Sequence, residues 1–123
     1  MRSNSSWLWP RLSILLLFAA ALLVASGPGF RSRAQLDEHY AKHGREFGNI
    51  SEDQYLRLAQ ALRDEPKGGP VLEASGPNGE FSRFDRRNGF FGAYNRDKTI
   101  RTFFVPADGE RYFHRQARRR GGR

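Results

Sequence analysis

The spacing of apolar side chains changes once along this chain, and that change limits the possible fold more than any other feature. Between residues 34 and 62, apolar side chains recur every three or four positions, which is the spacing of one helical face. From Val71 onward, apolar and polar side chains alternate within short segments that are separated by turn residues, which is typical of strands. Two helices followed by a run of strands predict an α+β fold with an antiparallel sheet.

Two helices are expected before the strands. The first is expected over Ala34–Phe47, where one face carries Leu36, Tyr40, His43 and Phe47. The second begins after Ser51, which has the spacing of a capping box with Gln54. The buried stripe of this second helix is expected to be Tyr55, Leu58, Ala59 and Leu62.

Four strands, or five, are expected after a loop over residues 64–70. The expected segments are Val71–Ala74, Gly79–Asp85, Phe90–Asn95, Thr99–Val105 and Arg111–His114. Because the links between them are short, they predict a meander. We expect the helices to cover one face of this sheet and to leave the other face free for function. The folded domain is expected over residues 34–116, between a linker of residues 27–33 and a basic disordered tail of residues 117–123.

The first 26 residues have the layout of an export signal. Arg2 and Arg11 precede Leu12–Ala25, a run of 14 residues that are apolar except for one serine, and small residues follow at the expected cleavage site. A membrane-spanning helix needs about 20 apolar residues, so a cleaved signal is favoured over a membrane anchor. The first interpretation predicts a secreted or periplasmic protein, and the second predicts a protein held to the membrane by its N-terminal helix.

Charge is unevenly distributed along the rest of the chain. Residues 27–80 carry a net charge of −2, whereas residues 81–123 carry 12 basic and 4 acidic side chains, a net charge of +8. Arginine dominates this second part, and guanidinium groups grip phosphate through paired hydrogen bonds. Basic residues interleaved with aromatic ones indicate a nucleic-acid surface. A generic solubilising surface, or attraction to anionic lipid, would give the same composition.

Few kinds of site are compatible with this composition. The chain has no cysteine and only three histidines, and it contains none of the common phosphate-loop, zinc-protease or serine-hydrolase motifs. We therefore expect no metal and no cofactor. The 97 residues after the signal suit one small domain, expected to be a monomer, whose core uses nine phenylalanines.

Candidate catalytic and binding residues come from the first helix and the strands. His43 shares the apolar face of its helix and has a side chain suited to proton transfer, although a core histidine would show the same pattern. His39, one turn earlier, is interpreted as a surface residue. Arginines in or beside strands could hold phosphate or be solvated: Arg83, Arg86 and Arg101. Three polar side chains could orient a phosphate or a hydroxyl, or simply favour strands: Asn95, Thr102 and Tyr112.

Two stretches of the chain resemble known proteins. Both resemble the small toxin nucleases that are grouped with barnase, EndoU, colicins and RelE. The first stretch is HYAKHGREFGNISEDQYLRLAQAL, and the second is FSRFDRRNGFFGAYNRDKTIRTFFVP, followed by ERYF. The resemblance runs from about Leu36 to Gln116. It implies helices on a four-stranded antiparallel sheet and metal-independent RNA cleavage. It also implies that His43, Arg83 and Thr102 belong to the catalytic site. The sequence departs from the family pattern at one turn, which usually reads Asp-Gly and is Asp97-Lys98 here.

Two functions are therefore compatible with the sequence. The first is an exported, metal-independent endoribonuclease that uses the 2′-hydroxyl of RNA as the nucleophile, with His43, Arg83, Thr102 and Tyr112 as catalytic residues. Arg86, Asn95 and Arg101 would bind the substrate. Such an enzyme is either a toxin, with an immunity protein as a second partner besides RNA, or a freestanding ribonuclease. The second is a non-catalytic secreted or periplasmic module that binds nucleic acid or anionic envelope polymers.

Overall fold

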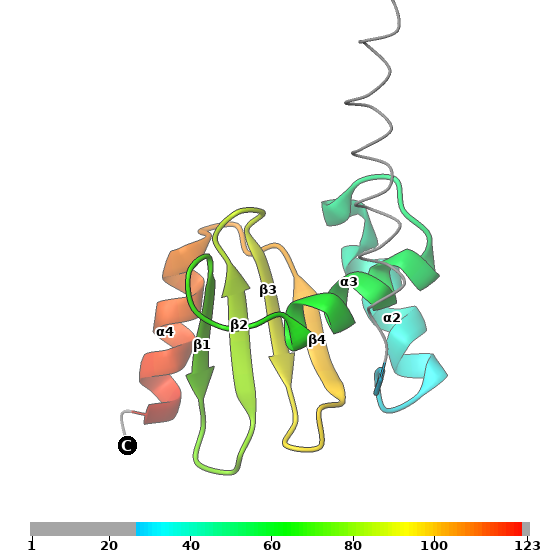
Figure 1. The fold of residues 1–123 in the computed structure, drawn as a ribbon. Coiled ribbons are helices and arrows are strands. Elements are labelled where there is room, and N and C mark those ends of the chain that lie inside the picture. The colour runs from blue at the N-terminus through cyan, green and yellow to red at the C-terminus, as the bar shows by residue number, and fades with distance from the viewer. Residues whose placement is uncertain (1–26, 122–123) are drawn as a thin grey trace, which may run out of the picture.

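The structure is a computed structural model and describes residues 27–121, so the expected export signal lies outside the described residues. Three helices and four strands make up this part of the chain (Figure 1). The elements, in order, are α2 (Arg33–His43), a 3-10 helix (Gly44–Phe47), α3 (Glu52–Asp64), β1 (Val71–Ser75), β2 (Phe81–Asp85), β3 (Phe90–Tyr94), β4 (Ile100–Phe104) and α4 (Glu110–Gly121). No helix within residues 27–121 has the length and apolar character needed to cross a membrane.

The predicted α+β fold is confirmed. The strands form one antiparallel sheet in the order β1-β2-β3-β4, so each strand pairs with its neighbour in sequence. The turns after β1 and β3 therefore lie at one end of the sheet, and the turn after β2 lies at the other (Figure 1). In the pairing of β3 with β4, Ala93 faces Thr102 and Tyr94 faces Ile100, which leaves Arg101 in a bulge.

Helix α3 covers one face of the sheet. The predicted capping box is present, with both the Ser51 side chain and the Gln54 side chain bonded to the backbone. Two buried tyrosines attach α3 to the sheet, because Tyr55 donates to the Phe103 carbonyl at 2.5 Å and Tyr94 donates to the Ala59 carbonyl at 2.9 Å. The core on this face contains mainly side chains from α3, β3 and β4: Tyr55, Ala59, Leu62, Tyr94, Ile100 and Phe103.

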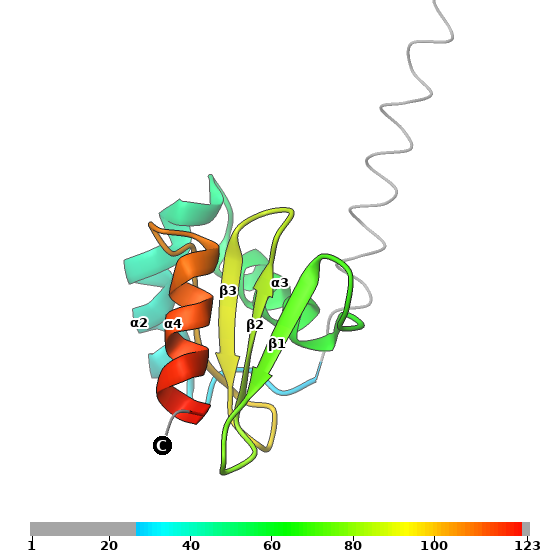
Figure 2. The ribbon, with the colours of Figure 1, turned by 90° about the vertical axis from the view of Figure 1, so that its left-hand side faces the viewer.

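The opposite face of the sheet was expected to be free, but helix α4 covers it (Figure 2). The expectation of a fifth strand over residues 111–114 is therefore wrong, and so is that of a disordered tail for residues 117–121, while residues 122–123 lie outside the described residues. In the sequence, this segment is too short for Tyr112 and Phe113 to distinguish the alternation of a strand from the three-to-four spacing of a helix. In the structure Phe113 packs against Phe84, while Tyr112 packs against Phe91 and Phe104. Burial of these two rings stabilises a helix that its arginine-rich composition does not predict.

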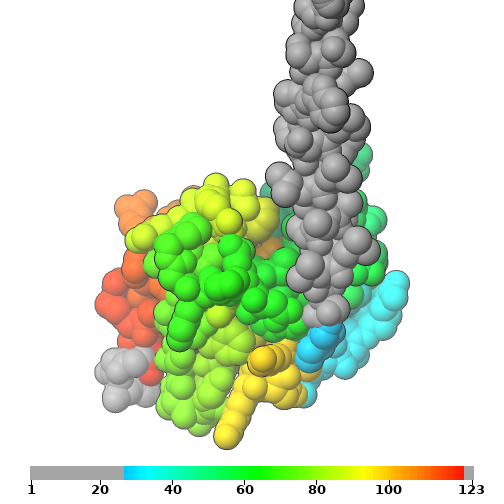
Figure 3. Space-filling view, viewed as in Figure 1, coloured from blue at the N-terminus to red at the C-terminus, as the bar shows by residue number. Residues whose placement is uncertain are grey.

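The segment before α2 was expected to be a linker, but it packs against β4 and α3. The Ile100 N–H donates to the Gly29 carbonyl at 2.9 Å, and Phe30 forms a parallel bridge with Ile100. The Gln60 side chain donates to the Gly27 carbonyl at 3.0 Å. Figure 3 shows this segment directly beside the turn between β3 and β4. These contacts cover part of the β4 edge, which would otherwise present unpaired backbone groups.

Candidate functional site

Four aromatic rings form a column along the edge of β4. Phe30 stacks on His39 with 5.0 Å between ring centroids, His39 lies 6.2 Å from His43, and His43 stacks on Phe104 at 5.2 Å. The column brings together the segment before α2, helix α2 itself and the end of β4. Both imidazoles of α2 consequently lie beside the same strand.

The position of His43 is fixed by contacts on both sides of it. Helix α2 changes to a 3-10 helix at Gly44, where a Cβ atom would lie 2.6 Å from the Tyr40 ring, so the chain needs glycine there. Glu46 in the 3-10 helix accepts a hydrogen bond from the Val105 N–H at 2.8 Å, which attaches this turn to the end of β4. Its other carboxylate oxygen lies 2.9 Å from His43 Nδ1. Glu46 thus orients the imidazole and leaves Nε2 for a further partner.

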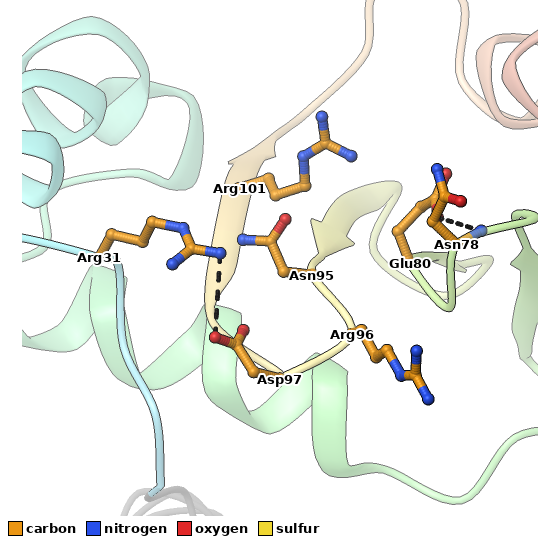
Figure 4. A pocket seen from close by; sticks show the side chains of 7 residues that line it. All are labelled: Arg31, Asn78, Glu80, Asn95, Arg96, Asp97 and Arg101. Atoms are coloured by element: carbon orange, nitrogen blue, oxygen red, sulfur yellow. Dashed lines mark hydrogen bonds and ion pairs between the residues drawn. The ribbon is translucent and has the colours of Figure 1, made fainter.

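Two adjoining pockets lie at the start of β4, and we refer to them together as the β4 groove. Their volumes are about 800 and 230 Å³. Both are lined by Arg31, Asn95 and Arg101. The larger pocket extends to the turns after β1 and β3, with Asn78, Glu80, Arg96 and Asp97; the smaller extends to α2, with Gln35, Glu38, His39 and Ile100. Figure 4 shows Asn95 between Arg31 and Arg101, with Glu80 and Asn78 on the opposite wall.

The arginines of the β4 groove differ in their partners. Arg31 forms a long ion pair with Asp97 at 3.8 Å, and hydrogen bonds from Thr99 hold the pKa of the Asp97 carboxyl below its ordinary value. Arg96 and Arg101 have no ion pair with any residue that the structure describes, and both are exposed. Two guanidinium groups without an ion pair suit an anionic ligand, in a groove whose lining also carries the carboxylates of Glu38, Glu80 and Asp97.

His39 is half-buried and lines the smaller pocket, whereas the sequence suggested a surface residue. Burial lowers the pKa of His39, and the neighbouring His43 lowers it further. Its Nδ1 atom is enclosed and has no hydrogen-bond partner among residues 27–121, so Nε2 is the nitrogen left to meet a ligand. A neutral imidazole of this kind can accept a proton.

The structure brings five of the seven sequence-predicted site residues to β4 and its surroundings. Asn95 and Arg101 line the groove. His43 and Tyr112 both pack against Phe104, whose ring centroid lies 5.2 Å from His43 and 5.3 Å from Tyr112, and neither lines the β4 groove. Thr102 is half-buried opposite Ala93 and shares the α4 face of the strand with Phe104, two residues on.

The other two predicted residues lie elsewhere. Arg83 is on the α3 face, with its side chain 10 % exposed and paired with Glu73 at 2.7 Å. It also donates to the carbonyls of Leu62 and Glu65. Arg86 is exposed and forms an ion pair with Glu110 at 2.9 Å. Neither arginine lines the β4 groove.

Three basic groove residues were missed from the sequence: Arg31, His39 and Arg96. His39 had a usable signal, because in HYAKH it precedes His43 by four residues, a spacing that places both imidazoles on one helix face. Arg31 and Arg96 had none, since both belong to irregular segments whose position depends on long-range contacts. Residues 27–121 contain no group of three or more His, Asp or Glu side chains placed to hold a metal ion. The chain matches no protein-family model, and no curated protein matches it.

Proposed function

We propose that this protein is an exported endoribonuclease that cleaves RNA in the β4 groove without a metal ion. The observation that carries the proposal is a pair of neighbouring imidazoles beside a groove with two unpaired arginines: His39 lines the groove, and His43, which lines neither pocket, lies 6.2 Å from His39 between ring centroids. Cleavage of RNA through its own 2′-hydroxyl needs a base, an acid and cations, and it needs no nucleophile from the protein. The similarity to small toxin nucleases supports the same chemistry.

Each group has a defined role in the proposed reaction. The 2′-oxygen attacks the adjacent phosphorus while its proton passes to His39, whose pKa is lowered by burial and by His43. The bond from phosphorus to the 5′-oxygen breaks, and that oxygen takes a proton from His43, which Glu46 orients. The products are a 2′,3′-cyclic phosphate and a 5′-hydroxyl. Arg101 would stabilise the negative charge that develops on the phosphoryl oxygens.

Other groups would position the RNA. Arg31 and Arg96 lie along the groove from Arg101 and suit the neighbouring phosphates, and the Asn95 amide can both donate and accept a hydrogen bond. Thr102 and Tyr112 lie on the α4 side of β4, where they could contact the RNA as it leaves the groove. Arg83 has no part in this proposal, because its guanidinium is used by Glu73 and by two carbonyls of the α3 end.

Export is proposed from the first 26 residues alone, on their resemblance in layout to a cleaved signal. Mass spectrometry of protein recovered from the periplasm or medium should give a start at Gly27 or Pro28. Full-length protein in the membrane fraction would indicate an anchor instead. Soluble cytoplasmic protein that begins at Met1 would contradict both.

The contacts of His43 are equally compatible with the alternative of a non-catalytic binding module. His43 contacts Glu46 and Phe104, and a purely structural histidine would make the same contacts. The two functions differ in the fate of bound RNA: a nuclease degrades it in excess chelator, whereas a binding module retards it in a gel and leaves it intact.

Substitution of the histidines tests the proposed site. His39→Gln and His43→Gln should each lower the single-turnover rate by about 10²–10⁴-fold, the usual contribution of general acid–base catalysis. The matched control is His114→Gln, on the exposed side of α4, which should keep the wild-type rate. The free energy of unfolding of each variant must be measured in parallel. A His43 variant that is less stable yet fully active would remove His43 from the site.

A further inference from the structure

Helix α4 carries a stripe of arginines on the side that faces away from the sheet. Phe113 packs against the sheet, and the residues that share its helical face are Gln116, Ala117 and Arg120. Four other arginines are exposed: Arg111, Arg115, Arg118 and Arg119, which we call the α4 stripe. Arg115 pairs with Asp108, whereas the remaining three have no ion pair with residues 27–121.

The α4 stripe is continuous with the proposed catalytic site. The guanidinium of Arg115 lies over the Tyr112 ring, 5.6 Å from its centroid. Tyr112 contacts Phe104, and Phe104 stacks on His43. Because Tyr112, Arg115 and Arg119 follow spacings of three and four, they share a helix face on the β4 side of α4. A chain of contacts therefore leads from His43 through Phe104 and Tyr112 to Arg115 of the stripe.

The chemistry of α4 favours RNA over a membrane as the ligand of this stripe. A helix that lies in a membrane interface needs an exposed apolar face to insert. In α4 the apolar side chains are already used, because Phe113 is buried against the sheet and Tyr112 is packed on Phe91 and Phe104. What remains exposed is His114 and the four arginines of the stripe, and arginine binds phosphate without insertion.

We propose that the α4 stripe is a second RNA-binding surface, which binds the RNA strand where that strand leaves the β4 groove. The proposal rests on the proposed nuclease function and specifies its substrate class: RNA several nucleotides long, contacted by both surfaces at once. Since α4 is a helix packed on the sheet, the stripe positions the RNA relative to His39 and His43 in addition to attracting it. A dinucleotide would occupy the groove alone.

The test compares short and long RNA in a variant that lacks two stripe arginines. Dissociation constants are measured for uncleavable 2′-O-methyl RNA of about 4 and about 16 nucleotides, the range of site sizes for single-strand-binding domains. Arg118→Gln combined with Arg119→Gln should weaken binding of the long RNA about tenfold and leave the short RNA unchanged. The slope of log affinity against log salt should fall by about 1.4 for the long RNA, or about 0.7 for each lost phosphate contact.

The matched control is Arg57→Gln combined with Lys67→Gln, which removes two positive charges on the α3 side of the sheet. It should leave the preference for long RNA intact. Equal losses in the control, or equal losses for short and long RNA, would overturn the proposal. So would a variant that loses binding to phosphatidylserine vesicles while keeping its RNA affinity. If the wild-type protein cleaves RNA in any of these cases, the proposed function stands; if it neither binds nor cleaves RNA, both fail.

Discussion

The two ends of the sheet use arginine in opposite ways. At the end that carries the turn after β2, Arg86 pairs with Glu110, and Arg87 pairs with Asp85 and Glu65. At the end that carries the turns after β1 and β3, Arg96 and Arg101 have no acidic partner within residues 27–121. Both ends contribute to the same basic half of the sequence, so composition alone does not distinguish them.

The difference shows which positive charges are available to a ligand. At the paired end, burial raises the pKa of Asp85, but hydrogen bonds from Arg87 and Asn88 outweigh it and leave the pKa below its ordinary value. The pKa of Glu110 falls to about 2 beside Arg86 and His114. Arginines that pair with carboxylates in this way already have a partner within the protein, so they are less available to a ligand. Among residues 27–121, the end with the turns after β1 and β3 combines the two arginines that lack an ion pair with a groove and with the His39 imidazole.

The largest effect is expected at Arg83, the most deeply buried arginine among the predicted site residues. Arg83→Ala would leave Glu73 and the carbonyls of Leu62 and Glu65 without their donor, so the free energy of unfolding should fall by about 3–5 kcal/mol. Urea unfolding measures this loss. The cleavage rate per folded molecule should not change.

The control for this prediction is Arg86→Ala, whose ion pair with Glu110 is exposed and should contribute about 1 kcal/mol or less. If Arg83→Ala instead remained stable and lost activity, Arg83 would belong to the catalytic site, as the family resemblance implies.

Arg83 also shows where prediction from sequence stops. Alternation places its side chain on one face of β2, but it cannot reveal that Glu73 and the end of α3 lie opposite. By contrast, α3 and the four strands follow from local signals, because the Ser51–Gln54 capping box and the turn residues act within a few positions. Helix α4 and the segment before α2 were missed, since each depends on distant partners: Phe84 for the former and Ile100 for the latter.

The candidate site was predictable in the same uneven way. Asn95 and Arg101 were chosen as binding residues from their strand context, and the structure places both in the β4 groove. Their neighbour Arg31 comes from 64 positions before Asn95 and shares no pattern with it. Contacts of that kind appear only once the chain has folded.

A smaller effect is expected at Arg101, the unpaired counterpart of Arg83. Arg101→Ala should change the free energy of unfolding by no more than about 0.5 kcal/mol, because the side chain is exposed and unpaired. RNA affinity should decline, and the slope of log affinity against log salt should be reduced by about 0.7, the value for one phosphate contact on a single strand. Salt titration of binding measures both. An unchanged slope would show that Arg101 does not meet phosphate.

The smallest effect concerns pH and His39. Burial and His43 lower its folded-state pKa, so between that value and the unfolded value of about 6.5 the unfolded chain binds more protons. This contribution to stability is present above about pH 6.5 and is lost as pH falls. His39→Phe, which can still stack on Phe30, should therefore flatten the decline in stability below neutral pH. A parallel decline in the variant would assign the effect to other groups.

The ends of the RNA products test the central claim most directly. The purified protein is incubated with a defined RNA in excess chelator, and the product masses are measured. Metal-independent attack by the 2′-hydroxyl predicts fragments that end in a 2′,3′-cyclic phosphate and begin with a 5′-hydroxyl. Intact RNA, cleavage that the chelator abolishes, or fragments with a 5′-phosphate and a 3′-hydroxyl would contradict the proposed reaction in the β4 groove.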